Sequence, residues 1–414
     1  MNYTKIRLNL EKQLGDEINQ SVQGEIINEI LKTARIEVLE NRKQLFLEGH
    51  FFEITKALTP GIYKTFGQVI RALDFKEEIE FYICSQAIKD VVTIPRLSKG
   101  SAHIIALSSR LIDRLDEGEL RFLIGYEIGK LITRNAAIAR TVNYVFPASD
   151  TIPIPLKNKI NFWVKLSDLS ADRFAYIASP DIEKAVSCLF KLSSGLSAAK
   201  IKFDSSAYLV HNEALLADLS ANEDVNIASY PVNPLRLKAI DIFSKSAMYK
   251  AITAGEFIDD AALDEEIHSL LSNFVSLFDS ELDRHRMLFI ALGGALIAKA
   301  DKNIAESEYN NILKALNSFT LNPERILKKA MGADKATLKE TLEISTAYIL
   351  QKNPVERKSM FTYLINLALA DNAIMKTEVR ELFALGKSVF QYSETEIAEM
   401  IAAAIQESFI PKLF

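Results

Sequence analysis

The stretch DEGELRFLIGYEIGKLITRNA, from Asp116 to Ala136, decides how this chain folds. Its apolar residues recur at steps of three and four, which predicts one long and largely buried helix. Acidic residues fill the first turn and an arginine stands near the far end, as the helix dipole favours. Tyr126, Glu127 and Lys130 interrupt the apolar pattern in the middle of this helix. Because polar residues rarely lie inside a buried helix, these three are candidates for a functional site.

Composition limits the class of protein. At 414 residues the chain exceeds one ordinary hydrophobic core, so we expect two or three domains. Its 49% hydrophobic and 25% charged residues fit a soluble, well-cored protein. The net charge of -5 gives no electrostatic case for binding nucleic acid or an anionic membrane.

We expect a cytoplasmic protein without a membrane span. Cys84 and Cys188 are the only cysteines, which argues for a reducing compartment. The N-terminal sequence is charged and lacks the apolar core of a signal peptide. The longest apolar run, residues 287–298, falls short of the roughly 20 residues that cross a bilayer. We interpret this run as a buried helix in which Gly293 and Gly294 allow close helix packing.

The chain is predicted to be predominantly helical with a small sheet, in the α+β class. Short apolar strands are expected at residues 80–84 and 102–107, with another extended piece at 93–95. Beyond about residue 247 prolines become sparse and amphipathic helices follow one another. The predicted segments are an N-terminal helical segment (1–48), a mixed domain (49–246), a helical connector (247–282) and an all-helical domain (283–414).

The helical domain contains an internal repeat. AKADKNIAESE at 298–308 matches ALADNAIMKTE at 368–378, and each copy carries an aspartate followed by a glutamate. Two interpretations of Asp301, Glu308, Asp371 and Glu378 stay open. Their oxygens are ligands that calcium or magnesium prefers. Alternatively, each aspartate caps the next helix and each glutamate complements its dipole.

Several blocks, taken in order, resemble a known family. They are EFYIC (80–84), AHIIAL (102–107), the central helix, SDLSADRFA (167–175) and YPVNPLRLKAI (230–240). In these blocks, residues from about 50 to 243 are similar to the HtpX-like and CAAX-prenyl-protease-like zinc metallopeptidases. Through their two acidic corners, residues from about 283 to 409 resemble the TerB-like domains of tellurite-resistance proteins. The resemblance implies a gluzincin-type metallopeptidase domain with a small sheet, followed by an all-α TerB-like bundle.

The resemblance also implies a zinc site that has lost its histidines. The family helix carries H-E-x-x-H, with two imidazole ligands and a general-base glutamate. Here Tyr126 and Lys130 take the histidine positions, and Glu127 keeps that of the general base. A phenol stays protonated at neutral pH because its ordinary pKa is about 10, and an ammonium has no free lone pair. We therefore expect no zinc cofactor and no zinc-peptidase activity.

Three further positions carry over from the same resemblance. Asp168 stands at the third-ligand position, one methylene shorter than the usual glutamate, and Asp172 at the position that orients a ligand histidine. Tyr230 replaces the late histidine of the family. Three carboxylates buried together would raise one another's pKa. We therefore hypothesise that the Lys130 ammonium lies among Glu127 and the two aspartates.

The strand at 102–107 has a predicted binding role. In the family an extended peptide adds to the edge strand before the active helix, here represented by Ala102, His103, Ile104, Ile105 and Ala106. A protein that binds polypeptides without cutting them would use this edge. The alternative is that another part of the chain, such as the N-terminal helices, covers it.

The sequence thus predicts a catalytically degenerate metallopeptidase-like protein. It would bind or scaffold a protein or peptide partner in a cytoplasmic assembly linked to stress or defence, an association that the TerB-like resemblance alone implies. Two alternatives stay open. One is an active metalloendopeptidase that uses Glu127, Asp168 and Asp172 with an oxygen-preferring ion, and the other is a divalent-cation sensor that uses the acidic corners.

Overall fold

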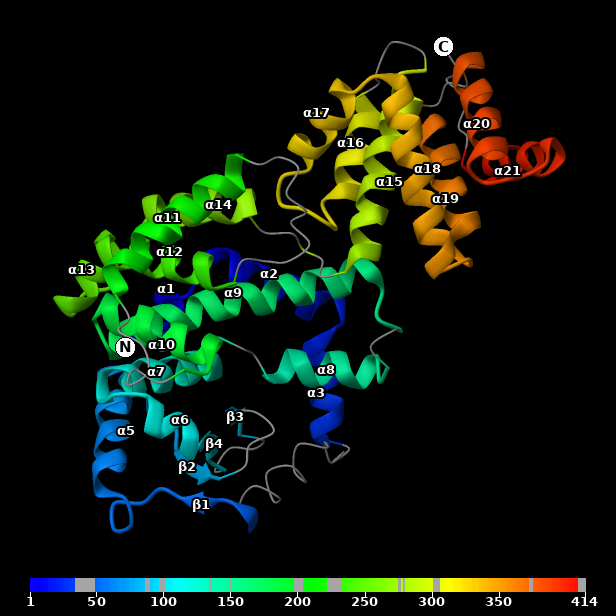
Figure 1. Ribbon diagram of the computed structural model, residues 1–414. Coiled ribbons are helices and arrows are strands. Elements are labelled where there is room, and N and C mark those ends of the chain that lie inside the picture. Colours follow the sequence, from blue (N-terminus) through cyan, green and yellow to red (C-terminus); the bar gives the residue numbers. More distant parts are fainter. Residues whose placement is uncertain are drawn as a thin grey trace. The chain divides into compact units, whose positions relative to one another are not determined.

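The computed structural model describes most of the chain. The described residues are 1–33, 49–85, 90–96, 101–133, 136–148, 151–196, 204–221, 232–274, 277, 280–300, 306–371 and 375–408. The chain divides into two compact units, residues 1–225 with 231–274 and residues 226–230 with 275–414. Helices predominate, and the first unit contains a four-stranded sheet (Figure 1), which confirms the predicted predominantly helical α+β class. No helix in the described part is long and apolar enough to cross a lipid bilayer.

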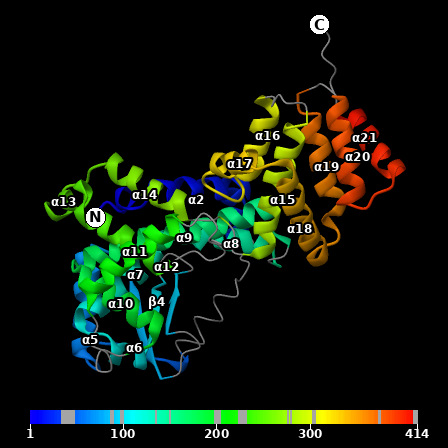
Figure 2. The same cartoon turned by 45° about the horizontal axis from the view of Figure 1, so that its top comes forward.

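The sheet has the strand order β1-β2-β4-β3, and Figures 1 and 2 show it from two directions. Its strands are β1 (Phe52–Glu53), β2 (Ile79–Cys84), β3 (Val91–Ile94) and β4 (His103–Ser108). β4 runs parallel to β2 and antiparallel to β3, and all of its residues are buried. The helix α5 (Pro60–Ala72) packs on β2 through Phe66, whose ring centroid lies 4.3 Å from that of Phe81.

β4 is an interior strand, so the prediction that residues 102–107 form an edge strand is wrong. Its sequence is apolar without alternation, as is typical of a strand that is covered on both faces. The described edge on this side of the sheet is β3, which contains Thr93 and ends before Pro95. A proline fits just beyond an edge strand because it has no N–H to donate to a ladder.

Two helices that lie side by side form the centre of the first unit, α7 (Glu117–Thr133) and α9 (Ile154–Ala178) (Figure 1). Glycines on α7 let them approach closely. A Cβ atom on Gly125 would lie 2.9 Å from Ala175 Cα, and one on Gly129 would lie 2.8 Å from Ala171 Cα. A close-packed interior does not tolerate such distances, so this contact depends on both glycines.

Further helices of the first unit pack around this pair. α1 (Tyr3–Ile6) and α2 (Asn9–Ser21) pack on α9, where the buried carboxylate of Glu11 accepts a hydrogen bond of 3.3 Å from Trp163 Nε1. α12 (Val232–Lys245) also packs against α9. The remaining described helices of this unit are α3 (Gly24–Thr33), α6 (Ser109–Arg114), α8 (Ala136–Val145), α10 (Ile182–Ser194), α11 (Ser205–Ala221), α13 (Ala247–Thr253) and α14 (Ala261–Phe274).

The second unit is helical in its described part and is built around α15 (Glu281–Ala298). A Cβ atom on Gly293 would lie 2.8 Å from Leu364 Cδ2, and one on Gly294 would lie 2.8 Å from Ile312 Cδ1, which confirms the predicted close packing. The helices around it are α16 (Glu306–Leu316), α17 (Pro323–Gly332), α18 (Lys335–Lys352), α19 (Glu356–Ala368), α20 (Lys376–Ser388) and α21 (Glu394–Ser408).

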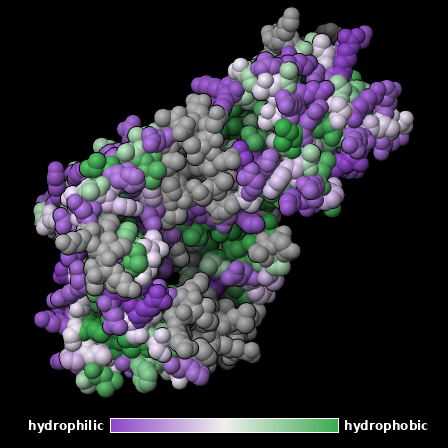
Figure 3. All heavy atoms as spheres, viewed as in Figure 1, coloured by the Kyte–Doolittle hydropathy of each residue, from purple (hydrophilic) through white to green (hydrophobic). Residues whose placement is uncertain are grey.

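Polar and apolar side chains are interspersed on the face of the molecule drawn in Figure 3. Among the described residues, exposed large apolar side chains lie on several separate elements, for example Ile26 on α3 and Val210 on α11. Scattered apolar residues of this kind are normal on protein surfaces and do not mark a binding face. Cys84 and Cys188 are both buried, and they do not form a disulfide with each other.

Candidate functional site

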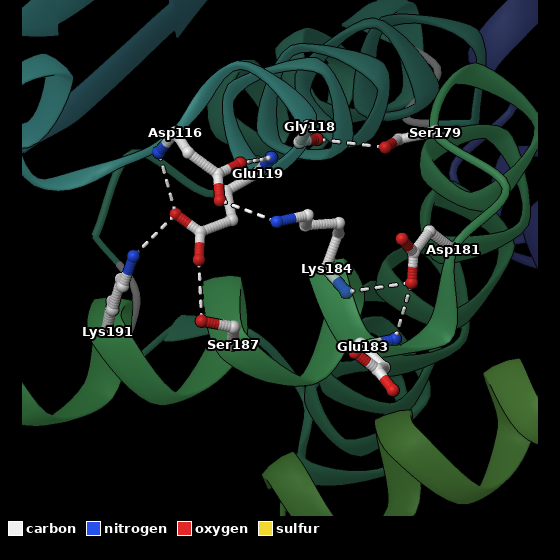
Figure 4. Close-up of polar contacts among 9 residues, drawn as sticks. All are labelled: Asp116, Gly118, Glu119, Ser179, Asp181, Glu183, Lys184, Ser187 and Lys191. Atoms are coloured by element: carbon white, nitrogen blue, oxygen red, sulfur yellow. Dashed lines mark hydrogen bonds and ion pairs between the residues drawn. The ribbon is translucent and has the colours of Figure 1, made fainter. Parts of the chain in front are cut away.

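A network of polar contacts fixes the start of α7 (Figure 4). Asp116 Oδ1 accepts a hydrogen bond of 3.0 Å from the Glu119 N–H, and Glu119 Oε2 accepts one of 2.8 Å from the Asp116 N–H. This reciprocal arrangement is a capping box. Glu119 is also held from α10, because Lys191 Nζ lies 2.6 Å from Glu119 Oε2 and Ser187 Oγ lies 2.5 Å from Glu119 Oε1. The cap sets the position of α7 and therefore of the residues at its middle.

A cavity of about 540 Å³ opens beside this cap. Two of its charged groups pair with each other, because Lys184 Nζ lies 2.7 Å from Asp116 Oδ2 (Figure 4). Its lining residues on α7 precede Glu127 by roughly 9 Å (Arg121) to 15 Å (Glu117) along the helix axis, at 1.5 Å of rise per residue, and none of them belongs to the altered motif. The lining residues are Asp116, Glu117, Gly118, Arg121, Ser179, Pro180, Asp181 and Lys184.

Glu127, at the general-base position, lies in the middle of α7 and is only 3% exposed. Its Oε2 atom accepts a hydrogen bond of 2.5 Å from Thr93 Oγ1 on the edge strand β3. The same oxygen lies 2.6 Å from Lys130 Nζ, one turn further along α7. A lysine at the second histidine position therefore forms an ion pair with the glutamate, and the edge strand contacts the same carboxylate.

Tyr126, at the first histidine position, is a hydrogen-bond donor. Its hydroxyl donates to Asp168 Oδ1 on α9 at 2.9 Å. Burial raises the pKa of Tyr126 well above its ordinary value, although the positive charge of Arg236 opposes this rise. The phenol consequently keeps its proton. Its ring lies against two cations, with Arg236 Cζ 4.5 Å and Lys130 Nζ 5.3 Å from the ring centroid.

Asp172 on α9 forms a two-pronged ion pair with Arg236 on α12. Arg236 Nε donates to Asp172 Oδ2 at 2.8 Å and Nη2 donates to Oδ1 at 2.6 Å. Burial raises the pKa of Asp172, and the adjacent guanidinium lowers it in part. Burial alone would lower the pKa of Arg236, but Asp172 and Tyr126 raise it well above its ordinary value. Geometry of this kind is among the strongest for a carboxylate and a guanidinium.

The hypothesis that Lys130 neutralises all three carboxylates is only partly right. Lys130 binds Glu127, whereas Asp172 is bound by Arg236 and Asp168 accepts from Tyr126. Arg236 and Thr93 also belong to this site, although neither was predicted from the sequence. The first belongs to the block YPVNPLRLKAI, so its presence near the site could have been expected from the resemblance. Nothing in the sequence pattern indicates the bond from Thr93.

These residues do not fit a zinc ion. A structural or catalytic zinc needs deprotonated or neutral donors, and here one histidine position holds a protonated phenol and the other an ammonium. Among the described residues, no group of three or more His, Cys, Asp or Glu side chains is arranged to hold a metal ion. The cations Lys130 and Arg236 contact the carboxylates that a metal ion would otherwise neutralise.

The other predicted site residues lie elsewhere. The side chains of His103, Ile104, Ile105 and Ala106 are buried in the interior strand β4 or at its start. Glu378 is buried at the start of α20, where its Oε2 accepts a hydrogen bond of 3.1 Å from the Met375 N–H. The side chain of Glu308 is also buried, and Asp371 is partly exposed and follows α19. Tyr230 and Asp301 lie outside the described residues.

Comparison with known proteins supports a distant relationship over part of the chain. The chain is 23% identical over 190 residues to the plastoglobule-localized metallopeptidase 48, chloroplastic, of Arabidopsis thaliana. The matched region is 42% of this chain and 55% of that protein, so the chain spans about half the length of its relative. No family model matches the chain, and no solved structure matches it. The match supports a metallopeptidase-like protein, and the TerB-like part stays a prediction.

Proposed function

We propose that this protein is a metallopeptidase-like binding protein that holds an extended polypeptide without cleaving it. The observation that carries the proposal is the 2.6 Å ion pair between Lys130 Nζ and Glu127 Oε2. A general base must be free to take a proton from an activated water. Glu127 instead neutralises an ammonium and accepts the Thr93 hydroxyl, and neither residue at the histidine positions can donate a lone pair to zinc.

The edge strand β3 is the binding surface in this proposal. Ser108 N–H donates to Asp90 C=O at 2.9 Å, so these two residues form a hydrogen-bonded pair at the start of the ladder. In an antiparallel ladder such pairs alternate with pairs that are not hydrogen-bonded. By the observed register, Val91 and Thr93 belong to the second kind and direct their N–H and C=O groups away from β4. In the described part of the chain β3 pairs with β4 alone.

A polypeptide strand added to β3 would lie beside the altered motif. Thr93 contributes outward-facing backbone groups and also bonds Glu127 through its side chain. Main-chain hydrogen bonds to such an edge give affinity with little dependence on sequence. The proposed partner is therefore an extended segment of protein or peptide. A cytoplasmic assembly linked to stress or defence remains the proposed setting, on the strength of the TerB-like resemblance.

Fluorescein-labelled casein, an unfolded polypeptide, tests this proposal when binding and cleavage are measured on the same samples. We expect casein to bind and to stay intact. Val91→Pro removes one outward N–H and leaves the β3–β4 ladder unbroken, so it should weaken binding by about tenfold, as expected for a lost hydrogen bond. Val92→Pro breaks the ladder itself and serves as the control for damage to the strand.

Two results would contradict the proposal. Cleavage of casein that is lost in Glu127→Gln would favour the active metalloendopeptidase. Equal casein affinity in Val91→Pro and in the unaltered protein, with the same melting temperature, would show that β3 is not the binding edge.

A further inference from the structure

His103, the first residue of β4, connects the end of the edge strand to the segment before β2. Its Nδ1 atom accepts a hydrogen bond of 3.0 Å from the backbone N–H of Arg96, two residues beyond β3. Its Nε2 atom lies 2.5 Å from Glu77 Oε2. The Arg96 guanidinium closes the cluster, because Nη2 donates to Glu77 Oε1 at 2.7 Å. The histidine is only 5% exposed.

These contacts assign the protonation state of the imidazole. A ring nitrogen that accepts an N–H bond carries no proton, so the neutral ring must carry its proton on Nε2 and donate it to Glu77. In the imidazolium both ring nitrogens are donors. Protonation of Nδ1 would therefore set an N–H against the Arg96 N–H and break that hydrogen bond.

The charged and titratable groups around His103 are few in the described part of the chain. Glu77 precedes β2 and Arg96 follows β3, and both contact the histidine. Tyr3 on α1 and Asp74 are further titratable groups that interact in this region: burial, and then the charges of Asp74 and Glu77, raise the pKa of Tyr3 to about 12. Burial lowers the pKa of His103, Glu77 raises it in part and Arg96 lowers it further. The neutral ring is thus the form present at neutral pH.

The two ends of β3 are anchored differently. At its start, Asp90 accepts hydrogen bonds from Ser108 Oγ (3.0 Å) and Arg114 Nη2 (3.2 Å). At its end, the backbone N–H of Arg96, which follows Pro95, is held to β4 by the side chain of His103. The second anchor contains an imidazole, the side chain whose ordinary pKa lies nearest to neutral pH.

We propose that His103 is a pH-sensitive latch on the edge strand, and that protonation of its imidazole frees the backbone at Arg96 and loosens the end of β3. The latch is closed at neutral pH and opens as pH falls. Because β3 carries Thr93, an open latch would also disturb the bond to Glu127. The consequence for polypeptide binding at this edge rests on the function proposed above, whereas the latch itself does not.

Hydrogen exchange of the free chain, read by mass spectrometry between about pH 7.5 and about pH 4.5, tests the latch without any peptide. After correction for intrinsic exchange rates, protection of residues 91–96 should fall by about tenfold, the factor expected from one lost hydrogen bond. The fall should follow the titration of His103, observed by NMR with labelled histidine. Since no ligand is present, the result does not depend on whether polypeptides bind.

Two variants make the test specific. His103→Asn places an amide oxygen where Nδ1 accepts from Arg96 and does not titrate, so residues 91–96 should keep their protection at low pH. His211→Asn, at an exposed position on α11, should behave as the unaltered protein does. The proposal would be overturned if protection were independent of pH, if His103 did not titrate above about pH 4.5, or if His103→Asn lost protection as the unaltered protein does.

Discussion

Two side-chain cations supply positive charge next to the buried carboxylates of this site. The Lys130 ammonium binds Glu127, and the Arg236 guanidinium binds Asp172. An isolated buried carboxylate is costly, so each cation offsets the desolvation of its partner. The cations also keep the carboxylates from acting as metal ligands, since each lies within hydrogen-bond distance of the oxygens that would coordinate.

Lys130→Ala should destabilise the protein by about 1–3 kcal/mol, because Glu127 would stay buried with only the Thr93 hydroxyl as partner. Urea unfolding followed by circular dichroism measures the change. Lys245→Ala is the matched control, since Lys245 pairs with Asp241 on the surface of α12 and such pairs contribute little. Equal stability of Lys130→Ala and the unaltered protein would contradict the importance of this pair.

Arg236→Met should cost about 3–5 kcal/mol near neutral pH, because it leaves Asp172 buried without its partner. Burial already raises the pKa of Asp172 above its unfolded value, and removal of the guanidinium raises it further. The folded state then binds a proton more tightly than the unfolded state, so stability falls as pH rises. The variant should therefore be less destabilised at about pH 5 than at about pH 8.

The double variant Arg236→Met with Asp172→Asn separates this effect from lost packing. With no carboxyl group at position 172, the difference in stability between the two pH values should disappear. If Arg236→Met lowered the free energy of unfolding by the same amount at both pH values, the guanidinium would act mainly through packing.

At the scale of elements, the contact between α7 and α9 places the site. The capping box at Asp116 fixes where α7 begins, and the two glycines let its middle lie against α9. Tyr126 and Glu127 on α7 thereby reach Asp168 and the edge strand. The site depends on this close approach, because longer separation would break the hydrogen bond from Tyr126 to Asp168.

Gly129→Ala should destabilise the protein by about 1–3 kcal/mol, since the added Cβ meets the backbone of Ala171 and the helices must separate. Gly67→Ala, in the interior of α5 with room around it, should instead stabilise by up to about 1 kcal/mol. Thermal unfolding of both variants checks the contrast. If both alanines shifted the melting temperature in the same direction, the close approach would not be what Gly129 provides.

The sequence predicted the positions of individual helices and strands better than it predicted which of them contact one another. Hydrophobic periodicity and acidic first-turn residues placed a helix at 116–136, and α7 spans Glu117–Thr133. The apolar run at 102–107 predicted a strand but not its place in the sheet, because a buried sequence does not say which strands pair with it. The pair of Asp172 and Arg236 joins residues 64 positions apart, and no local pattern encodes such a contact. Both errors concern contacts between distant segments.

At the scale of the whole molecule, the site that the functional proposal uses lies in the first of the two compact units. The match to the chloroplastic metallopeptidase covers 42% of the chain, and the sheet with the altered motif belongs to the first unit. The second unit is helical, and its resemblance to TerB-like domains is a prediction from the acidic corners. At one of these corners Glu378 accepts a hydrogen bond from the Met375 N–H at the start of α20, and the N-cap residue of that helix is Met375 rather than Asp371. The metallopeptidase-like part therefore carries the functional proposal.

The proposed function requires that the motif at Tyr126, Glu127 and Lys130 hold no zinc. Elemental mass spectrometry of the purified, untagged protein, expressed with added zinc, measures this directly. We predict far less than about one zinc per chain, because neither Tyr126 nor Lys130 offers a lone pair to the metal. A content of about one zinc per chain that falls in Glu127→Gln or Asp168→Asn would contradict the account and place a working metal site at this motif.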